Sequence, residues 1–223
     1  MTKRRAVKTS AKILVDVALY GLMLILMSYP VTRGLLRHGI CGMAFVTLLF
    51  LHHALNLSWH RTLFRGRWSA RRVLLSSTDI LLLLGSAALV ISSLVMAGDV
   101  FAFAPFPMPW WGRELHTATT AWTFALASFH LGLHGHGVWH SARRLTGRIW
   151  PVAALTLFAL GAALFVHSGL WNDMLMTGMP KARPASLLLF LTHYVGITLC
   201  FCLLGRGAWS LARKAPSLGS PRR

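Results

Sequence analysis

Residues 50–68 of the chain read FLHHALNLSWHRTLFRGRW. The first part of this stretch is apolar enough to lie in a membrane, whereas the second part carries three arginines. This order of apolar and then basic residues is typical of a membrane-spanning helix that ends on the cytoplasmic side. Two adjacent histidines, His52 and His53, lie in the apolar part, and an ionisable side chain in that position is a functional candidate by default.

Apolar stretches of this kind recur along the whole chain of 223 residues, of which 55% are hydrophobic and only 13% are charged. A soluble domain needs more polar surface than this composition supplies. Six stretches have roughly the 20 residues that a helix needs to cross a bilayer. They are residues 11–29, 36–59, 73–97, 115–139, 149–170 and 186–209. The sequence therefore predicts an all-α polytopic membrane bundle of six transmembrane helices, forming one integral membrane domain over residues 1–223.

The net charge of +18 alternates along the chain. Eighteen of the 23 Lys and Arg residues lie in residues 1–12, 60–72, 140–148 and 205–223, and only five lie in the other connections. This split follows the positive-inside rule and predicts a multi-pass protein with both termini on the cytoplasmic side. The basic blocks are interpreted as topology signals that also contact anionic membrane lipid, so nucleic-acid binding is not expected.

The eleven histidines contain one spacing that occurs twice. His38 and His52 stand at positions i and i+14 in the second predicted helix, and His116 and His130 stand at the same spacing in the fourth. A step of this length turns a helix to within about 40° of whole turns and advances it by about 21 Å. Each pair therefore lies near one helix face, with one member toward each side of the membrane.

The two histidine-bearing helices also match each other at a constant offset in the numbering. The matched pairs are Gly34 and Gly112, His38 and His116, His52 and His130, and Leu55 and Leu133. This match indicates a repeated helical hairpin, and repeats often place a binding site at their interface. Because both helices are expected to run in the same direction, His38 should lie level with His116, and His52 level with His130.

Facing pairs of histidines at two depths suit two haem b groups, one at each depth. The haem iron takes one axial imidazole from each side, and its porphyrin fills apolar space between helices. The sequence contains no C-x-x-C-H motif for covalent haem attachment. We therefore expect two haem b groups with the four axial ligands His38, His116, His52 and His130. An iron held by two histidines has no open position, so such a haem carries electrons rather than binding a substrate.

Two further histidines lie close to the expected ligands. His53 lies about 60° from the face of His38, against about 40° for His52, so it is an alternative ligand that the repeat offset disfavours. His134 follows His130 by one helical turn and takes the place of Asn56 in the first repeat. His53 and His134 are expected either as alternates or as residues that support the ligands without holding the iron.

The expected ligands divide the domain into a four-helix haem-binding core at residues 11–145, a further helical hairpin at 146–212 and a basic cytoplasmic tail at 213–223. The hairpin carries His167 and His193 toward the outer side, where they line a quinone pocket, contact the outer haem or pack at the interface. Packing is the favoured interpretation.

Two carboxylates, Asp16 and Asp79, lie one or two turns inside the cytoplasmic boundary. Lys12, Arg71 and Arg72 are close to them in sequence. We expect ion pairs between these carboxylates and cations rather than a path for protons.

The stretches LHHALNLSWHRTLF (51–64) and RELHTATTAWTFALASFHLGLH (113–134) resemble the flavinylation-associated cytochromes, small bacterial membrane proteins related to the di-haem cytochrome b group. The resemblance covers residues 34–65 and 73–140. It implies b-type haem bound by the four histidines and a location in the bacterial inner membrane. It also implies electron transfer with periplasmic flavoproteins that carry covalent FMN, the chain being the cytochrome subunit of an oxidoreductase system.

Two other functions stay open. A histidine-rich non-haem iron oxidase or hydroxylase would use the H-x-x-x-H of His130 and His134 and the H-H pair at residues 52–53, although its repeated H-x-x-H-H boxes are absent. A metal transporter or a membrane scaffold without haem is the other alternative. No P-loop or G-x-G-x-x-G motif is present, so an electron donor or acceptor, such as another protein or quinone, has to come from outside the chain.

Overall fold

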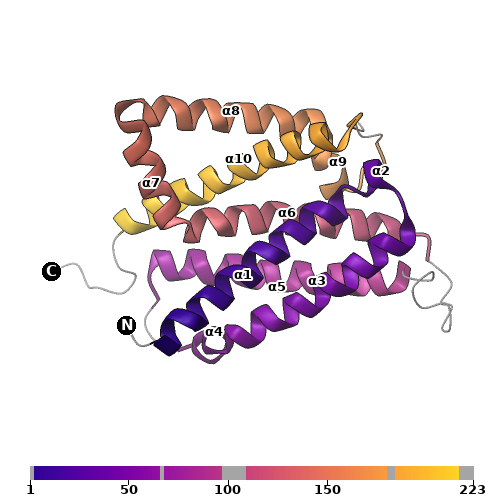
Figure 1. The fold of residues 1–223 in the computed structure, drawn as a ribbon, viewed down its shortest axis with the longest axis horizontal. Helices are drawn as coiled ribbons and strands as arrows, with labels where there is room; N and C mark the ends of the chain where they lie inside the picture. Colours follow the sequence, from indigo (N-terminus) through magenta and orange to yellow (C-terminus); the bar gives the residue numbers. More distant parts are fainter. Residues whose placement is uncertain (1–2, 66–67, 97–108, 180–183, 216–223) are drawn as a thin grey trace.

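The computed structural model describes residues 3–65, 68–96, 109–179 and 184–215, and every regular element in these ranges is a helix (Figure 1). The helices are α1 (Lys3–Met27), α2 (Tyr29–Thr32), α3 (Leu35–Leu55), α4 (Leu57–Thr62), α5 (Ala70–Met96), α6 (Gly112–His134), α7 (His136–Thr146), the 3-10 turn η1 (Gly147–Ile149), α8 (Trp150–Ser168), α9 (Leu170–Met174) and α10 (Leu187–Lys214). Residues 216–223 of the expected basic tail lie outside the described residues.

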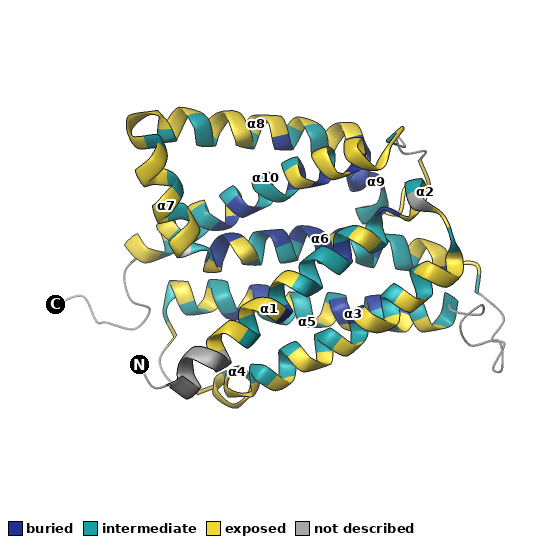
Figure 2. Ribbon diagram, in the orientation of Figure 1, coloured by how far each residue is buried: buried dark blue, intermediate teal, exposed yellow. Residues whose placement is uncertain are grey.

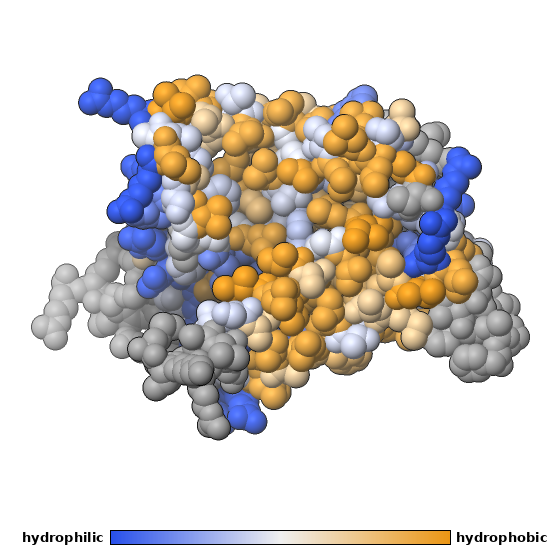
Figure 3. All heavy atoms as spheres, viewed as in Figure 1, coloured by the Kyte–Doolittle hydropathy of each residue, from blue (hydrophilic) through white to orange (hydrophobic). Residues whose placement is uncertain are grey.

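Five helical stretches are long and apolar enough to cross a membrane. They are Thr9–Val31, Leu35–Leu55, Ala70–Met96, Gly137–Ser168 and Leu187–Lys214. Large apolar side chains such as Leu14, Phe50 and Leu188 are exposed, and Figure 3 shows an apolar middle with hydrophilic groups gathered toward the two ends. An apolar surface of this extent is stable in lipid and not in water. The chain is a multi-pass membrane protein, and the predicted all-α fold is confirmed.

Helix α6 lies at the centre of the bundle, packed between α5 and α10, and it is the most buried of the long helices (Figure 2). A Cβ atom on Gly132 would overlap the backbone carbonyl of Cys202 on α10, and one on Gly205 would overlap that of Phe129 on α6. Glycines at such positions allow two membrane helices to pack backbone against backbone. This close contact fixes the rotation of α6, and therefore the directions in which its histidines point.

A polar network in the core joins three helices. The Tyr20 hydroxyl of α1 lies 2.8 Å from the Ser128 Oγ atom of α6 and 2.6 Å from the Thr198 Oγ1 atom of α10. Hydrogen bonds between helices hold membrane bundles together because lipid offers no partner for these groups. The network therefore ties α1 to the α6–α10 pair.

The two histidine-bearing helices end earlier than predicted. Helix α3 ends at Leu55 instead of residue 59, because Asn56 leaves helical geometry at φ −110° and ψ 24°. The Asn56 side-chain amide donates to the carbonyl of His52 at 2.9 Å, which satisfies one of the carbonyls left open at the helix end. Helix α6 ends at His134 instead of residue 139, and the chain turns at Gly135 into α7.

The bundle has two distinct ends (Figure 1). Helix α1 begins and α10 ends at the same end as α4 and α7, which we call the α4 end. The short helices α2 and α9 lie at the opposite end, which we call the α2 end. Helix α3 packs on α1, and α8 packs on α10.

Candidate functional site

The four histidines of the repeated spacing occupy matching positions on two helices. Helix α3 carries His38 near its beginning and His52 near its end, and α6 carries His116 and His130 in the same way. Midway between the two histidines of α3 lies a buried side chain, Phe45. Its counterpart on α6 is Thr123, which is also buried. Both pairs therefore lie on the helix faces that point into the bundle.

The structure brings His38 and His116 together at the α2 end, as the sequence predicted. Their ring centroids are 6.2 Å apart, and the ring planes are inclined by 76°. The His116 Nδ1 atom lies 3.4 Å from Ser92 Oγ and 3.3 Å from Ser93 Oγ, both on α5. The His38 ring also contacts the Tyr29 ring at a centroid distance of 5.1 Å.

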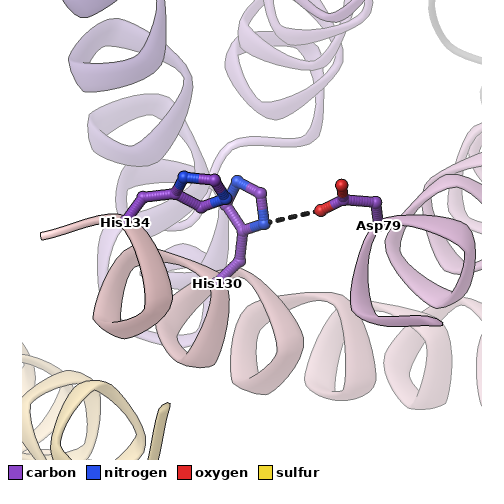
Figure 4. Close-up of side chains that lie close together, drawn as sticks. All are labelled: Asp79, His130 and His134. Carbon is purple, nitrogen blue, oxygen red and sulfur yellow. Dashed lines mark ion pairs between the residues drawn. The ribbon is translucent and has the colours of Figure 1, made fainter. Parts of the chain in front are cut away.

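At the α4 end, His52 and His130 each face a carboxylate on a neighbouring helix. The His52 Nδ1 atom lies 2.7 Å from Asp16 Oδ1 on α1. The His130 Nδ1 atom lies 3.0 Å from Asp79 Oδ1 on α5 (Figure 4). Among the described residues, no ring contact joins His52 directly to His130, so their facing arrangement stays a prediction.

In the part of the chain that the structure describes, Asp16 and Asp79 form no ion pair with the nearby lysine or arginine, so that prediction is wrong. Both carboxylates contact histidines instead. Lys12 donates to Asn56 Oδ1 at 2.7 Å, and Arg72 donates to the backbone carbonyls of Thr62 and Leu63. The short aspartate side chains lie within reach of imidazoles on the neighbouring helices, while the longer cationic side chains extend toward the surface.

The contact between His130 and Asp79 is close but poorly aligned. The two atoms are 3.0 Å apart, yet both are buried and neither has a partner in hydrogen-bonding geometry. A buried polar atom without an aligned partner carries a free-energy cost, and its presence in a native site needs an explanation. A ligand that fixed the other ring nitrogen would also fix the orientation of this imidazole.

His134 and His53 have different surroundings. The ring centroids of the exposed His134 and of His130 are 4.4 Å apart. Asp79, His130 and His134 each offer one atom that could bind a metal ion, and these three atoms lie within 4.8 Å of one another (Figure 4). The His53 Nδ1 atom lies 3.2 Å from His60 Nε2 on α4. His53 therefore faces the peripheral α4, whereas His52 faces α1, so His52 is the better candidate of the two for a ligand.

A third pair of histidines lies in the last hairpin. The His167 and His193 rings of α8 and α10 have centroids 5.8 Å apart. An apolar groove of about 330 Å³ lies elsewhere, between α5, α6 and α9, and its lining includes Leu84, Trp122 and Met174 but neither of these histidines.

The geometry of the first pair fits two ligands of one metal. An axial imidazole nitrogen lies about 2 Å from its metal and the ring centre roughly 1 Å beyond, so two imidazoles on opposite sides of one iron have ring centres roughly 6 Å apart. The 6.2 Å between His38 and His116 matches this distance. An ordinary edge-to-face ring contact has the same range, as the pair in the last hairpin illustrates. What distinguishes the first pair is its place in a repeated spacing.

Sequence reasoning missed the partners of the ligand candidates. The hydroxyls of Ser92 and Ser93, and the histidine contacts of Asp16 and Asp79, emerge only from the structure. The sequence places each aspartate on the long helix that precedes a histidine-bearing helix, but it does not indicate which side chains of the two helices meet. Comparisons with protein-family models, curated proteins and solved structures gave no match to this chain.

Proposed function

We propose that the chain is a membrane cytochrome that transfers electrons through two b-type haems, each held by two histidines. His38 and His116 hold one haem at the α2 end, and His52 and His130 hold the other at the α4 end. The observation that carries the proposal is the meeting of His38 and His116, which the repeated spacing predicted and which joins two helices far apart in sequence.

Helix α6 can be a sixth membrane span although it carries polar side chains. Helix α6 has 23 residues, enough to cross the apolar layer, but its charged and hydroxyl residues keep it outside the five strongly apolar stretches. The hydroxyl side chains of Thr123 and Ser128 are buried, and α5 and α10 pack on either side of α6, whereas Arg113 and Glu114 are exposed in its first turn. Polar residues in a membrane helix are tolerated when they face protein rather than lipid. The sixth span and the repeat of α1–α3 in α5–α6 are parts of the proposal.

The charge distribution supports an orientation in the bacterial inner membrane with both termini on the cytoplasmic side. The basic segments next to α4 and α7, with the start of α1 and the end of α10, lie at the α4 end. The positive-inside rule places that end in the cytoplasm. The haem held by His38 and His116 then lies near the periplasmic surface, where the family resemblance implies a flavoprotein partner.

Each histidine has a definite task in this proposal. Each haem would supply one-electron chemistry, and two of the four imidazoles would hold each iron. At the outer pair, Ser92 and Ser93 lie within reach of the His116 Nδ1 atom, which is the nitrogen that does not hold the iron in this proposal. At the inner pair, His52 and His130, the two aspartates lie near the corresponding Nδ1 atoms. Groups at the non-coordinating nitrogen fix the tautomer and the orientation of a ligand. Donors and acceptors come from outside the chain, as a flavoprotein on one side and a quinol or cytoplasmic reductant on the other.

The experiment is a haem and metal count on the purified full-length protein. We expect about two haem b per chain by pyridine haemochrome and a six-coordinate, low-spin visible spectrum. A count near one would mean that only one histidine pair is occupied. Absence of a Soret band from protein produced in a haem-replete host would refute the proposal.

A second candidate is a site for one transition-metal ion, favoured by the cluster of Asp79, His130 and His134. Two imidazoles one turn apart and a carboxylate form a ligand set that zinc or ferrous iron accepts. The variant His134→Ala separates the two candidates. The haem proposal expects both haems to remain, whereas the metal-site proposal expects the bound metal, measured by mass spectrometry, to disappear.

A further inference from the structure

Carboxylates contact the candidate ligands at only one end of the described structure. Asp16 on α1 lies 2.7 Å from the Nδ1 atom of His52, and Asp79 on α5 lies 3.0 Å from that of His130. Each aspartate comes from the long helix that precedes the histidine-bearing helix in the chain. Both inner ligands therefore have an anion at the ring nitrogen opposite the one left for iron.

The other end has neutral partners. The Nδ1 atom of His116 faces the hydroxyls of Ser92 and Ser93 at 3.4 and 3.3 Å, and His38 packs against the Tyr29 ring. Within the described residues, the ion pairs involve no carboxylate at His38 or His116. Glu114, which precedes His116 on α6, is exposed.

This difference changes how strongly each pair donates electrons to a metal. An imidazole N–H that donates to a carboxylate, as the contact of His52 with Asp16 allows, makes the opposite nitrogen a stronger base. The contact of Asp79 with His130 is not aligned for a hydrogen bond, so Asp79 acts on that imidazole through its charge. Stronger axial donors and nearby negative charge stabilise the ferric state more than the ferrous state, which lowers the reduction potential. A hydroxyl partner gives a weaker, uncharged hydrogen bond.

We infer that Asp16 and Asp79 are positioning residues that make the inner haem the low-potential member of the pair, an inference that rests on the proposed function. One electron then passes downhill from the ferrous iron at the α4 end to the ferric iron at the α2 end. The inner iron is oxidised, the outer iron is reduced, and no bond or proton is exchanged in this step. The chain is thereby polarised for electron export from the cytoplasmic side.

The basic residues at the α4 end oppose this effect without cancelling it. Lys12 is bound to Asn56, Arg72 to two backbone carbonyls, and Arg71 lies over the Trp209 ring. The carboxylates lie 2.7 and 3.0 Å from the imidazoles, and Asp79 is largely buried, whereas charges at the aqueous surface are screened by water and salt. The two nearby carboxylates therefore affect the potential of the inner haem more than the more numerous but distant basic residues.

The test is a potentiometric titration of the full chain followed by visible spectroscopy. His38→Ala isolates the inner haem and His52→Ala isolates the outer haem, which assigns the two midpoint potentials. We expect the inner haem to titrate lower. Asp16→Asn and Asp79→Asn should each raise the inner midpoint so that the ferrous-to-ferric ratio at a fixed potential increases about tenfold, or about 59 mV for one electron.

Matched variants separate contact from general charge. Glu114→Gln removes one exposed carboxylate near His116 and should leave both potentials in place. Asp16→Glu and Asp79→Glu keep a carboxylate and should restore most of the wild-type value.

The possible failures are distinguishable. Wild-type protein without haem refutes the proposed function. Two haems with the inner one at the higher potential refute this inference alone, and so do Asn variants that keep both haems at unchanged potentials. Because the order of the wild-type potentials is measured independently, a variant that fails to assemble does not remove the test.

Discussion

Removing one histidine from either proposed pair should remove one haem and leave the other. We expect His38→Ala and His116→Ala to share one residual spectrum, and His52→Ala and His130→Ala to share a second. The haem content should fall from about two to about one per chain in all four variants. His53→Ala is the matched control, because this histidine faces His60 rather than the bundle interior, and it should keep both haems.

The distance along the helices limits how far one loss affects the remaining site. The helical rise between the two histidine levels is about 21 Å. Two unit charges at that distance interact by roughly 0.8 kcal/mol at an effective dielectric constant of about 20. This energy corresponds to about 34 mV for a one-electron couple. The midpoint of the remaining haem should therefore move by no more than this amount.

Difference spectroscopy with potentiometric titration on the five variants measures both quantities. Variants that fail to fall into two spectral groups would refute the layered arrangement of the ligands. Loss of the inner haem in His53→Ala but not in His52→Ala would show that the offset between the repeats is wrong by one position.

Three further outcomes follow from the topology and the packing. Reporter fusions at residues 105 and 180 should report the periplasm, and a periplasmic signal from a fusion within residues 60–72 would contradict the proposed orientation. Gly132→Leu should separate α6 from α10 at a cost of about 1–3 kcal/mol, seen as a lower melting temperature in detergent, because its Cβ would overlap a backbone carbonyl. Gly21→Leu, where a Cβ meets nothing within 4 Å, should melt like the wild type. Tyr20→Phe should lower stability by about 1 kcal/mol through two lost hydrogen bonds, and an unchanged melting temperature would show that they contribute nothing.

Composition and periodicity predicted the helices, because membrane spans are set by length and apolarity. The meeting of His38 and His116 was also predicted, since a fixed spacing on two matching helices determines which side chains share a level. Helix ends were less predictable. Asn56 and Gly135 end α3 and α6 inside continuous runs of mostly apolar residues, and hydropathy does not report such local geometry.

The partners of Asp16 and Asp79 could not be predicted from the sequence. Both carboxylates were assigned to nearby cations, because proximity in sequence is all that a single chain offers. Which face of α1 meets α3 depends on the rotation of both helices, and contacts elsewhere set that rotation, such as the hydrogen bonds of Tyr20. The repeat offset did not help either, because the position that it assigns to the counterpart of Asp16 is occupied by Leu94.

The two aspartates are separated from their histidines by different numbers of residues, and the proposed repeat accounts for this difference. The chain between Asp79 and His130 is longer than the chain between Asp16 and His52, because Asp79 lies farther from the end of its helix and because the connection in the second hairpin is longer. A longer connection shifts the sequence numbers while leaving the first helix of each hairpin free to present a carboxylate to the second.

The inner ends of the two hairpins are therefore alike in chemistry, with an aspartate at the Nδ1 atom of each proposed ligand. The outer ends differ, with serine hydroxyls at His116 and a tyrosine ring at His38. A two-fold arrangement that is kept at one end and lost at the other gives the two proposed haem sites unequal ligand fields, and a difference in reduction potential follows from that asymmetry.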